Sequence, residues 1–231
     1  MPAKTARFAV TTDERQIAYW AQDRGHRTHD HPVVQFFATQ RVEFIEQCLH
    51  LSNVTNALDV GCGNGFSTFY MRRRVPAIWA SDRSRFMLSR HPLRADRRLA
   101  AADAVALPFA DATFDLVYGW EVLHHMAEPV RAVREMARVS RRYVFLVEPN
   151  PWNAAQLAFA LWDPEHRWVL RYTRKYMGRL CEQAGLRVVR AVTGGWVLPN
   201  VTPDVLLGVL RRLPYRFALG LSNWVFAVKA V

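Results

Sequence analysis

The chain has 231 residues, of which 51% are hydrophobic and 22% are charged, and 31 Lys and Arg residues against 20 Asp and Glu residues give a formal net charge of +11. This length and composition indicate one globular domain with a full core. No apolar run approaches the roughly 20 residues that a membrane-spanning helix needs, and residues 1–8 lack the apolar core of a signal peptide. The scattered Cys48, Cys62 and Cys181 have neither disulfide nor zinc spacing. We therefore expect a cytoplasmic protein with no transmembrane segment and no metal.

The N-terminal part of the chain, residues 13–52, is predicted to be helical. Asp30 is followed by His31 and Pro32, which suits a helix cap with a proline in the first turn. Apolar side chains then recur at helical spacing at Val33, Phe36, Phe37, Val42, Phe44, Ile45, Cys48 and Leu49. We expect this segment to pack at the edge of a sheet or over a bound ligand.

From residue 56 onward, strand patterns alternate with helical patterns. The expected strands are 56–60, 77–81, 98–102, 114–118, 143–147, 186–192 and 223–231. The expected helices are Phe66–Arg74, Glu128–Arg138 and a segment that opens at Thr173 and ends at Gly185. Such alternation predicts an α/β fold with a parallel sheet covered on both faces. Ligands in these sheets lie beyond the carboxyl ends of the strands.

A glycine-rich turn follows the first strand at Asp59-Val60-Gly61-Cys62-Gly63-Asn64-Gly65. A strand, a glycine turn and a helix bring bare backbone N–H groups and a helix N-terminus to a ligand. The G-x-G-x-G spacing differs from the dinucleotide fingerprint, and no nucleoside triphosphate loop is present. Asp59 would repel a phosphate but suits an ammonium group, which favours S-adenosylmethionine.

The stretch Leu58–Gly65 resembles the first motif of class I S-adenosylmethionine-dependent methyltransferases. Leu107–Val117 is similar to the L-P-F-x-D-x-x-F-D-x-V signature of the type 11 family, which includes the quinone-modifying enzymes. The resemblance covers roughly residues 55–150 and, more weakly, 170–192. It implies a Rossmann-like, seven-stranded, mostly parallel sheet with an antiparallel last strand beside the fifth. It also implies S-adenosyl-L-methionine as cofactor and S-adenosyl-L-homocysteine as product.

Acidic residues at the ends of successive strands complete the expected cofactor site. Asp82 can accept hydrogen bonds from both ribose hydroxyls, and in the family an acid at the position of Asp103 accepts one from the adenine amino group. Cys62 is interpreted as a small residue that fits the turn rather than as a nucleophile. The residues expected to bind the cofactor are Asp59, Gly61, Cys62, Gly63, Asn64, Gly65, Asp82, Arg83, Asp103, Ala104, Tyr118 and Gly119.

The candidate catalytic residues follow the fourth strand, in Tyr118–Met126. Methyl transfer mainly requires alignment of donor and acceptor without water, and a hydroxyl acceptor benefits from a base such as histidine. His125 is the candidate base, whereas a structural role is favoured for the other candidate, His124. The reserve candidates are His29, His31 and Glu148, and the donor carboxylate could be held by Arg27 or Arg41.

The whole chain, 1–231, is expected to form one methyltransferase domain. Residues 1–52 are its N-terminal helical cap, 53–148 its cofactor-binding core, and 149–172 and 193–222 apolar lid segments that border a cavity next to Tyr118–His125. Such a lid favours a small, partly hydrophobic acceptor that is lipid-, quinone- or secondary-metabolite-like. The strongly basic charge keeps open an RNA or protein methyltransferase, and a non-catalytic cofactor-binding module is a third hypothesis.

Overall fold

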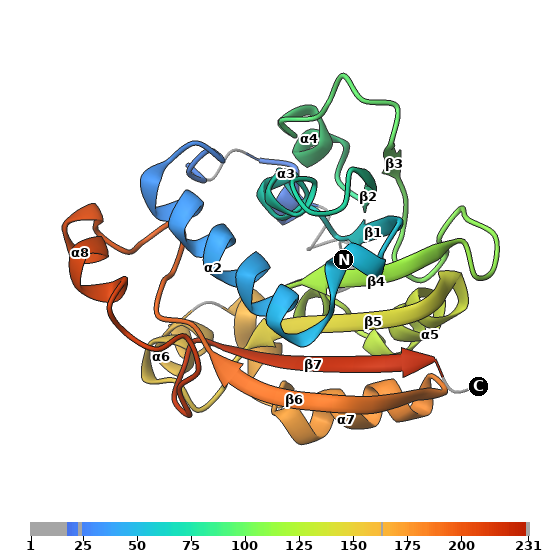
Figure 1. Ribbon diagram of the computed structural model, residues 1–231. Coiled ribbons are helices and arrows are strands. Elements are labelled where there is room, and N and C mark those ends of the chain that lie inside the picture. The colour runs from blue at the N-terminus through green and yellow to red at the C-terminus, as the bar shows by residue number, and fades with distance from the viewer. Residues whose placement is uncertain (1–17, 23–24, 163, 230–231) are drawn as a thin grey trace, which may run out of the picture.

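The computed structural model describes residues 18–22, 25–162 and 164–229 (Figure 1). Its seven strands form one sheet in the order β3-β2-β1-β4-β5-β7-β6. The strand bounds are β1 Asn56–Val60, β2 Ala77–Asp82, β3 Leu99–Ala101, β4 Phe114–Trp120, β5 Ser140–Pro149, β6 Leu186–Gly194 and β7 Ser222–Lys229. Because β7 is antiparallel to both of its neighbours while the pairs from β3 to β5 are parallel, the predicted fold class is confirmed.

Helices cover both faces of this sheet, as Figure 1 shows. The α-helices are α2 Pro32–Cys48, α3 Phe66–Met71, α4 Arg85–Ser89, α5 Pro129–Val139, α6 Ala154–Trp162, α7 Arg174–Gln183 and α8 Leu207–Leu210. Short 3₁₀ turns are η1 Leu51–Asn53, η2 Leu123–His125, η3 Pro164–Arg171 and η4 Asp204–Leu206. Helices α2 and α3 pack with one face of the strands, and α5 and α7 pack with the other.

The two cores follow from the alternation of side chains along each strand. In β1, Ala57 belongs to the core beneath α2 and α3, while Leu58 belongs to the core beneath α5 and α7. In β5, Phe145 and Leu146 divide in the same way. Strands that are buried on both faces in this manner leave only their ends for polar ligand contacts.

The predicted helix over residues 13–52 is correct only in part. Residues 13–17 lie outside the described residues, and the segment from Gly25 to Asp30 is not helical. The ring Nδ1 of His31 accepts the N–H of Val33 and caps α2, so the cap is one residue later than Asp30. Gly25 has a φ of +66°, a left-handed conformation that does not continue a helix.

Candidate active site

The glycine turn is bound to the neighbouring strand by two hydrogen bonds. The N–H groups of Gly61 and Cys62 donate to the carbonyl of Ser81, at 2.8 and 3.0 Å. A Cβ on Gly61 would lie 2.1 Å from Val122, so that glycine is required for packing. Gly63 has a φ of +54°, and the nearest atom to a Cβ there would be the methyl group of Met87 at 3.5 Å. Only Gly63 therefore leaves open space above the turn, as the close approach of a ligand requires.

Asp82 stands at the end of β2 and holds the same turn. Its carboxylate accepts the N–H of Gly63 at 2.8 Å and the N–H of Ser84 at 2.7 Å. Burial raises the pKa of this carboxyl above its ordinary value, although both hydrogen bonds lower it. Each oxygen retains a lone pair, so Asp82 can still accept the two hydroxyls of a ribose. The turn and this carboxylate fit an adenosyl ligand.

Asp59 lies beneath the turn rather than in it. Its side chain is fully buried, and its Oδ2 accepts hydrogen bonds from Ser67 at 2.5 Å, Thr68 at 2.7 Å and Tyr118 at 3.1 Å. Burial raises the pKa of Asp59 to about 6, against the effect of these three donors. All three donors reach Oδ2, whereas Oδ1 is buried without a hydrogen-bond partner among the described residues. Asp59 does not line the cavity, so the structure gives no support for direct contact between its carboxylate and an ammonium group. Asp59 instead supports the turn from below.

A cavity of roughly 580 Å³ lies at the carboxyl ends of β1, β2 and β4, within the range of small-molecule sites. The predicted cofactor residues that line it are Gly61, Cys62, Gly63, Asn64, Asp82, Arg83, Asp103 and Ala104. The predicted residues Asp59, Gly65, Tyr118 and Gly119 are not among its lining residues. A Cβ on Gly65 would lie 2.1 Å from the buried ring of His91, so Gly65 serves packing.

Asp103 marks the third strand end of the cavity. Its Oδ1 accepts the N–H of Val105 at 3.1 Å, and its Oδ2 lies 3.7 Å from Nε of Arg83. Asp103 and Ala104 therefore stand opposite the glycine turn with Asp82 between them in sheet order. Two of the three predicted acids, Asp82 and Asp103, thus line one cavity, whereas Asp59 does not.

Aromatic and apolar side chains also line the cavity. His125 lines it, and the ring of Trp20 meets the ring of His125 edge-on with centroids 5.1 Å apart. The ring of His26 stacks on the ring of Trp20 with centroids 5.7 Å apart. The sequence analysis did not single out Trp20 or His26, because neither a motif nor a strand end marks them. Met126 and Pro199 line the cavity as well.

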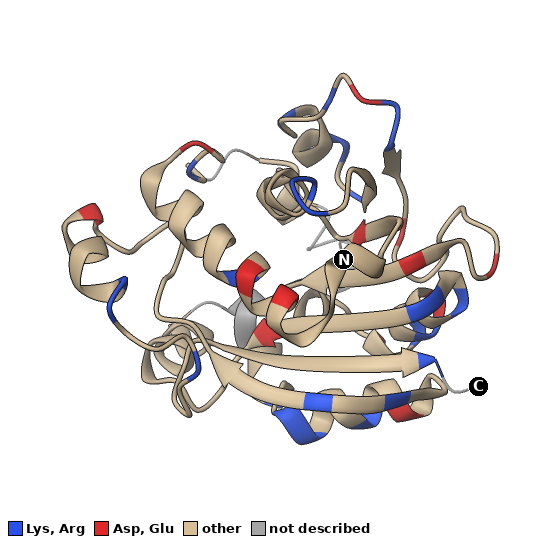
Figure 2. Ribbon diagram, viewed as in Figure 1, with Lys and Arg blue, Asp and Glu red and all other residues tan. Residues whose placement is uncertain are grey.

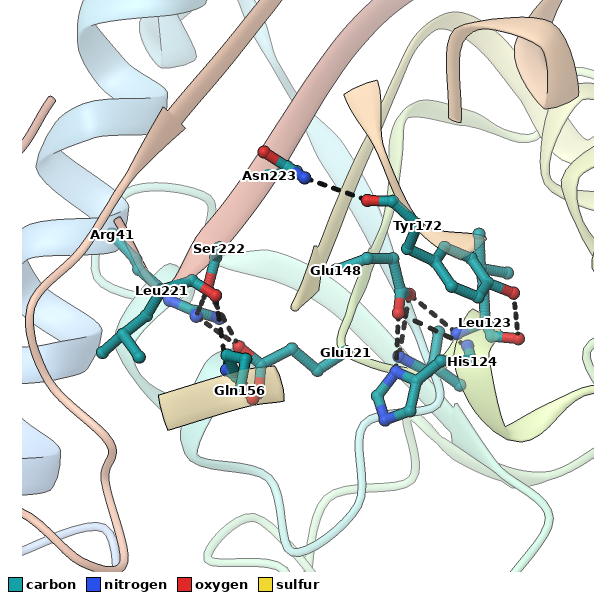
Figure 3. A network of polar contacts seen from close by, with 11 residues as sticks. Arg41, Glu121, Leu123, His124, Glu148, Gln156, Tyr172, Leu221, Ser222 and Asn223 are labelled. Atoms are coloured by element: carbon teal, nitrogen blue, oxygen red, sulfur yellow. Dashed lines mark hydrogen bonds and ion pairs between the residues drawn. The ribbon is translucent and has the colours of Figure 1, made fainter. Parts of the chain in front are cut away.

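His124 points away from the cavity into a buried network (Figure 3). Its Nδ1 lies 2.6 Å from Oε2 of Glu148, and both side chains are almost fully buried. Glu148 also accepts the backbone N–H groups of Val122 and Leu123, at 3.1 and 2.7 Å. This carboxylate therefore fixes η2, on which His125 sits. The favoured structural role for His124 agrees with this geometry.

A second polar network ends at the cavity wall at Glu121, which the sequence analysis did not single out. Arg41 forms an ion pair with Glu121, and its guanidinium also donates to Ser222 at 2.7 Å (Figure 3). Glu121 has a φ of +57° although it is not a glycine, a strained backbone that occurs at functional sites. Partial burial of the Glu121 carboxyl raises its pKa, but the charge and hydrogen bond of Arg41 outweigh this, so the pKa is lowered. Its position directly after the fourth strand could have indicated it.

The reserve candidates lie elsewhere. Arg41 is engaged by Glu121, and Arg27 donates to the carbonyls of Pro199 and Thr202, at 3.2 and 2.7 Å. Neither arginine lines the large cavity, and neither do His29 and His31. The expected roles of these side chains at the donor carboxylate or as a base therefore find no support in the geometry.

The two expected lid segments contribute little to the cavity. Only Pro199 and Asn200 of 193–222 line it, and within the described part of 149–172 no residue does. Trp196 instead stacks on Phe217 with ring centroids 4.3 Å apart, and its Nε1 donates to the carbonyl of Pro214 at 2.8 Å. The prediction that both segments border the cavity is thus wrong for 149–172. For 193–222 it holds only at Pro199 and Asn200.

Comparisons with known proteins agree with this fold and site. Residues 58–147 match a family model described as a methyltransferase domain. The 2-methyl-6-phytyl-1,4-hydroquinone methyltransferase of Synechocystis sp. is 25% identical over 95% of this chain and 77% of that protein. The chain spans about half of the length of several other curated relatives that it matches.

Solved structures share the fold at low identity. A possible histamine N-methyltransferase of Thermotoga maritima has a TM-score of 0.65 and 15% identity, covering 87% of this chain and 91% of its own. Magnesium protoporphyrin IX methyltransferase of Synechocystis, solved with bound S-adenosylmethionine, has a TM-score of 0.57 and 14% identity, covering 96% and 93%. Residues 58–147 thus match a methyltransferase domain, and the chain has the fold of S-adenosylmethionine-dependent methyltransferases.

Proposed function

We propose that this protein transfers the methyl group of S-adenosylmethionine to a small, partly hydrophobic acceptor of the lipid, quinone or secondary-metabolite class. The observation that carries the proposal is one cavity that is lined both by the glycine turn, Asp82 and Asp103 and by the aromatic rings of Trp20 and His125. In this proposal the donor lies against the glycine turn and the two acids, and the acceptor lies against the aromatic rings, which we name the aromatic or acceptor end. One cavity can thereby hold donor and acceptor in contact, as an in-line transfer requires.

The residues have distinct roles in this proposal. Asp82 accepts the ribose hydroxyls, and the open space above Gly63 admits the ligand to the backbone. The bound cofactor supplies a methyl group that its sulfonium already activates. Trp20 and Trp120 exclude water from the acceptor end, and His125 accepts the proton of an acceptor hydroxyl. Glu148 and His124 hold the backbone of η2, so that His125 keeps its position.

The acceptor class is supported by the aromatic end and by the hydroquinone that is named for the Synechocystis relative. A flat ring with a hydroxyl could lie beside Trp20 with its hydroxyl near His125. The alternative, a nucleic-acid acceptor, draws on the net charge of +11. Figure 2 shows Lys and Arg distributed over many elements and interspersed with acids, and several arginines form ion pairs, such as Arg138 with Glu135 and Arg141 with Asp115. This distribution favours the small acceptor.

The test combines binding with transfer of a labelled methyl group. Calorimetry with S-adenosylhomocysteine should give saturable, one-site binding, and labelled donor should transfer to phenolic or hydroquinone acceptors at a rate that salt changes little. Preferential methylation of RNA or protein, with activity lost as salt rises from low to physiological strength, would favour the basic-surface alternative. Tight cofactor binding without transfer to any acceptor in extract fractions would support a non-catalytic module.

A further inference from the structure

The first expected lid segment presents apolar side chains to solvent rather than to the cavity. Helix α6, Ala154–Trp162, contains no charged residue. Trp152, just before it, is 73% exposed, and Leu161 and Trp162 within it are 73% and 87% exposed. Single exposed apolar residues are ordinary, but a continuous apolar helix with exposed tryptophans marks an interaction surface.

The second segment presents a similar surface. Val201 and Val205 are 71% and 86% exposed, and Val209 and Leu219 are also exposed. This surface begins directly at the cavity, because Pro199 and Asn200 line the cavity and Val201 follows them. The exposed apolar residues thus continue the rim of the proposed active site.

The two segments are joined at the same end of the molecule. Nδ2 of Asn153 donates to the carbonyl of Leu219 at 2.7 Å, and Nε2 of Gln156 donates to the carbonyl of Leu221 at 3.3 Å. Figure 1 shows α6 and α8 at one end of the sheet, the end at which β6 terminates. We name residues 152–162 and 200–219 together the apolar rim.

Positive charge flanks the apolar rim. Within 200–219 the charged residues are Asp204, Arg211, Arg212 and Arg216, and the three arginines are exposed. Figure 2 shows this segment with basic residues below α8 and its acid at the far tip. Apolar and aromatic side chains flanked by arginines are the pattern of a surface that lies on anionic lipid headgroups.

We propose that the apolar rim docks this protein on the surface of an anionic lipid bilayer. The proposal rests on the proposed function, because a lipid-like acceptor would reach the cavity from the bilayer past Pro199 and Asn200. A bilayer is favoured over a protein partner by the exposed Trp152 and Trp162, since tryptophan prefers the headgroup region, and by the exposed arginines of 200–219. No helix within the described ranges has the length and hydropathy of a bilayer-crossing segment, so the expected contact is peripheral.

The experiment is sedimentation of the full chain with vesicles, without cofactor or acceptor. Vesicles of phosphatidylcholine with phosphatidylglycerol should bind the wild type, and pure phosphatidylcholine vesicles should bind it much more weakly. The double variant R211S/R212S should lower the partition coefficient roughly 10- to 30-fold, because each arginine near an anionic surface contributes about tenfold or less. The double variant W162S/V205S should lower it similarly through lost apolar contact.

The controls remove the same charge, or exposed apolar area, elsewhere on the molecule. R97S/R187S removes two exposed arginines at the opposite end of the strands, and V189S removes an exposed valine on β6. These controls should bind vesicles like the wild type. Circular dichroism and the affinity for S-adenosylhomocysteine should be unchanged in every variant, which shows that each protein folds and that the cofactor site is intact.

Three results would overturn the proposal. The first is wild-type protein that binds S-adenosylhomocysteine but not anionic vesicles. The second is an equal loss of vesicle binding in R211S/R212S and R97S/R187S, which would show that binding depends on net charge and not on the position of the arginines. The third is a stable dimer in lipid-free light scattering that W162S/V205S dissociates, which would assign the apolar rim to a second copy of the chain. Failure of cofactor binding with intact vesicle binding would count against the proposed function instead.

Discussion

The ring of His124 and the carboxylate of Glu148 lie 2.6 Å apart in the buried wall behind the cavity. The same carboxylate accepts N–H groups from three consecutive residues, Val122, Leu123 and His124. One side chain at the end of β5 therefore fixes the segment that carries His125. The arrangement links a strand end to the position of the candidate base without touching a ligand.

Glu148→Gln should destabilise the protein and reduce methyl transfer. The glutamine amide carries no charge, and its NH₂ group replaces a carboxylate oxygen that accepts hydrogen bonds. Its two N–H groups would then face the N–H groups of the η2 segment. We therefore expect the free energy of unfolding to fall by roughly 2–4 kcal/mol. Urea unfolding measures this loss. Methyl transfer should fall more than the affinity for S-adenosylhomocysteine, because the altered segment lies beside the acceptor. Glu182→Gln, on the exposed side of α7, should change neither quantity; a Glu148→Gln variant as stable as the wild type would refute this role.

Gly63→Ala should weaken cofactor binding more than folding. A Cβ there meets only Met87 at 3.5 Å, yet it enters the space above the turn. The matched control is Gly185→Ala, because Gly185 also has positive φ, at +75°, with nothing within 4 Å of its Cβ. Both should lose about 1 kcal/mol of stability from backbone strain. Only Gly63→Ala should reduce S-adenosylhomocysteine affinity, by tenfold or more in calorimetry, and equal affinities in the two variants would remove Gly63 from the site.

Asp82→Ala should weaken S-adenosylhomocysteine and methylthioadenosine to a similar extent. Both ligands contain the ribose, and each would lose its acceptor at a cost of roughly 1–3 kcal/mol. The variant also releases the N–H of Gly63, so a loss of stability should accompany it. Competition titration of the two ligands measures the affinities. Weakening of one ligand alone would place the ribose away from Asp82.

Asp59→Asn should remove a pH-dependent cost of folding. The pKa of Asp59 is about 6 in the folded protein against an ordinary value of 3.8. Between these values the folded state holds a proton that the unfolded state has lost, so stability falls as pH rises from about 4 to 6 and stays reduced above it. The difference corresponds to roughly 3 kcal/mol. Unfolding free energies of variant and wild type should therefore diverge in favour of the variant across this window; a constant difference would contradict the raised pKa.

The strands and the glycine turn were predictable from sequence because they depend on local patterns. Alternating glycines after an apolar strand, and acids at Asp82 and Asp103, require only neighbours in the chain and the geometry of parallel sheets. The depth of Asp59 was not predictable, because it is enclosed by hydroxyls from α3 and by Tyr118 of β4. Its burial depends on how these elements pack.

The outer parts of the site were harder to predict for a related reason. Apolar composition alone does not say whether a loop faces a cavity or solvent, so residues 149–172 were expected as a lid although Trp162 points to solvent. Trp20 lies beside His125 across more than a hundred residues of sequence, and no local pattern encodes such a contact. Glu121 shows its significance only through its positive φ and the ion pair with Arg41.

His125→Asn should reduce the turnover of a phenolic acceptor by roughly 10²–10⁴-fold, the usual contribution of a positioned base. His125 lines the cavity beside Trp20, where we propose the acceptor, whereas the cofactor is proposed to lie against Gly63. The affinity for S-adenosylhomocysteine should therefore stay within about twofold of the wild type. His50→Asn, at an exposed histidine after α2, should keep the wild-type rate. A His125→Asn enzyme with nearly wild-type turnover would show that transfer proceeds by alignment of donor and acceptor alone, with His125 as a wall of the acceptor site.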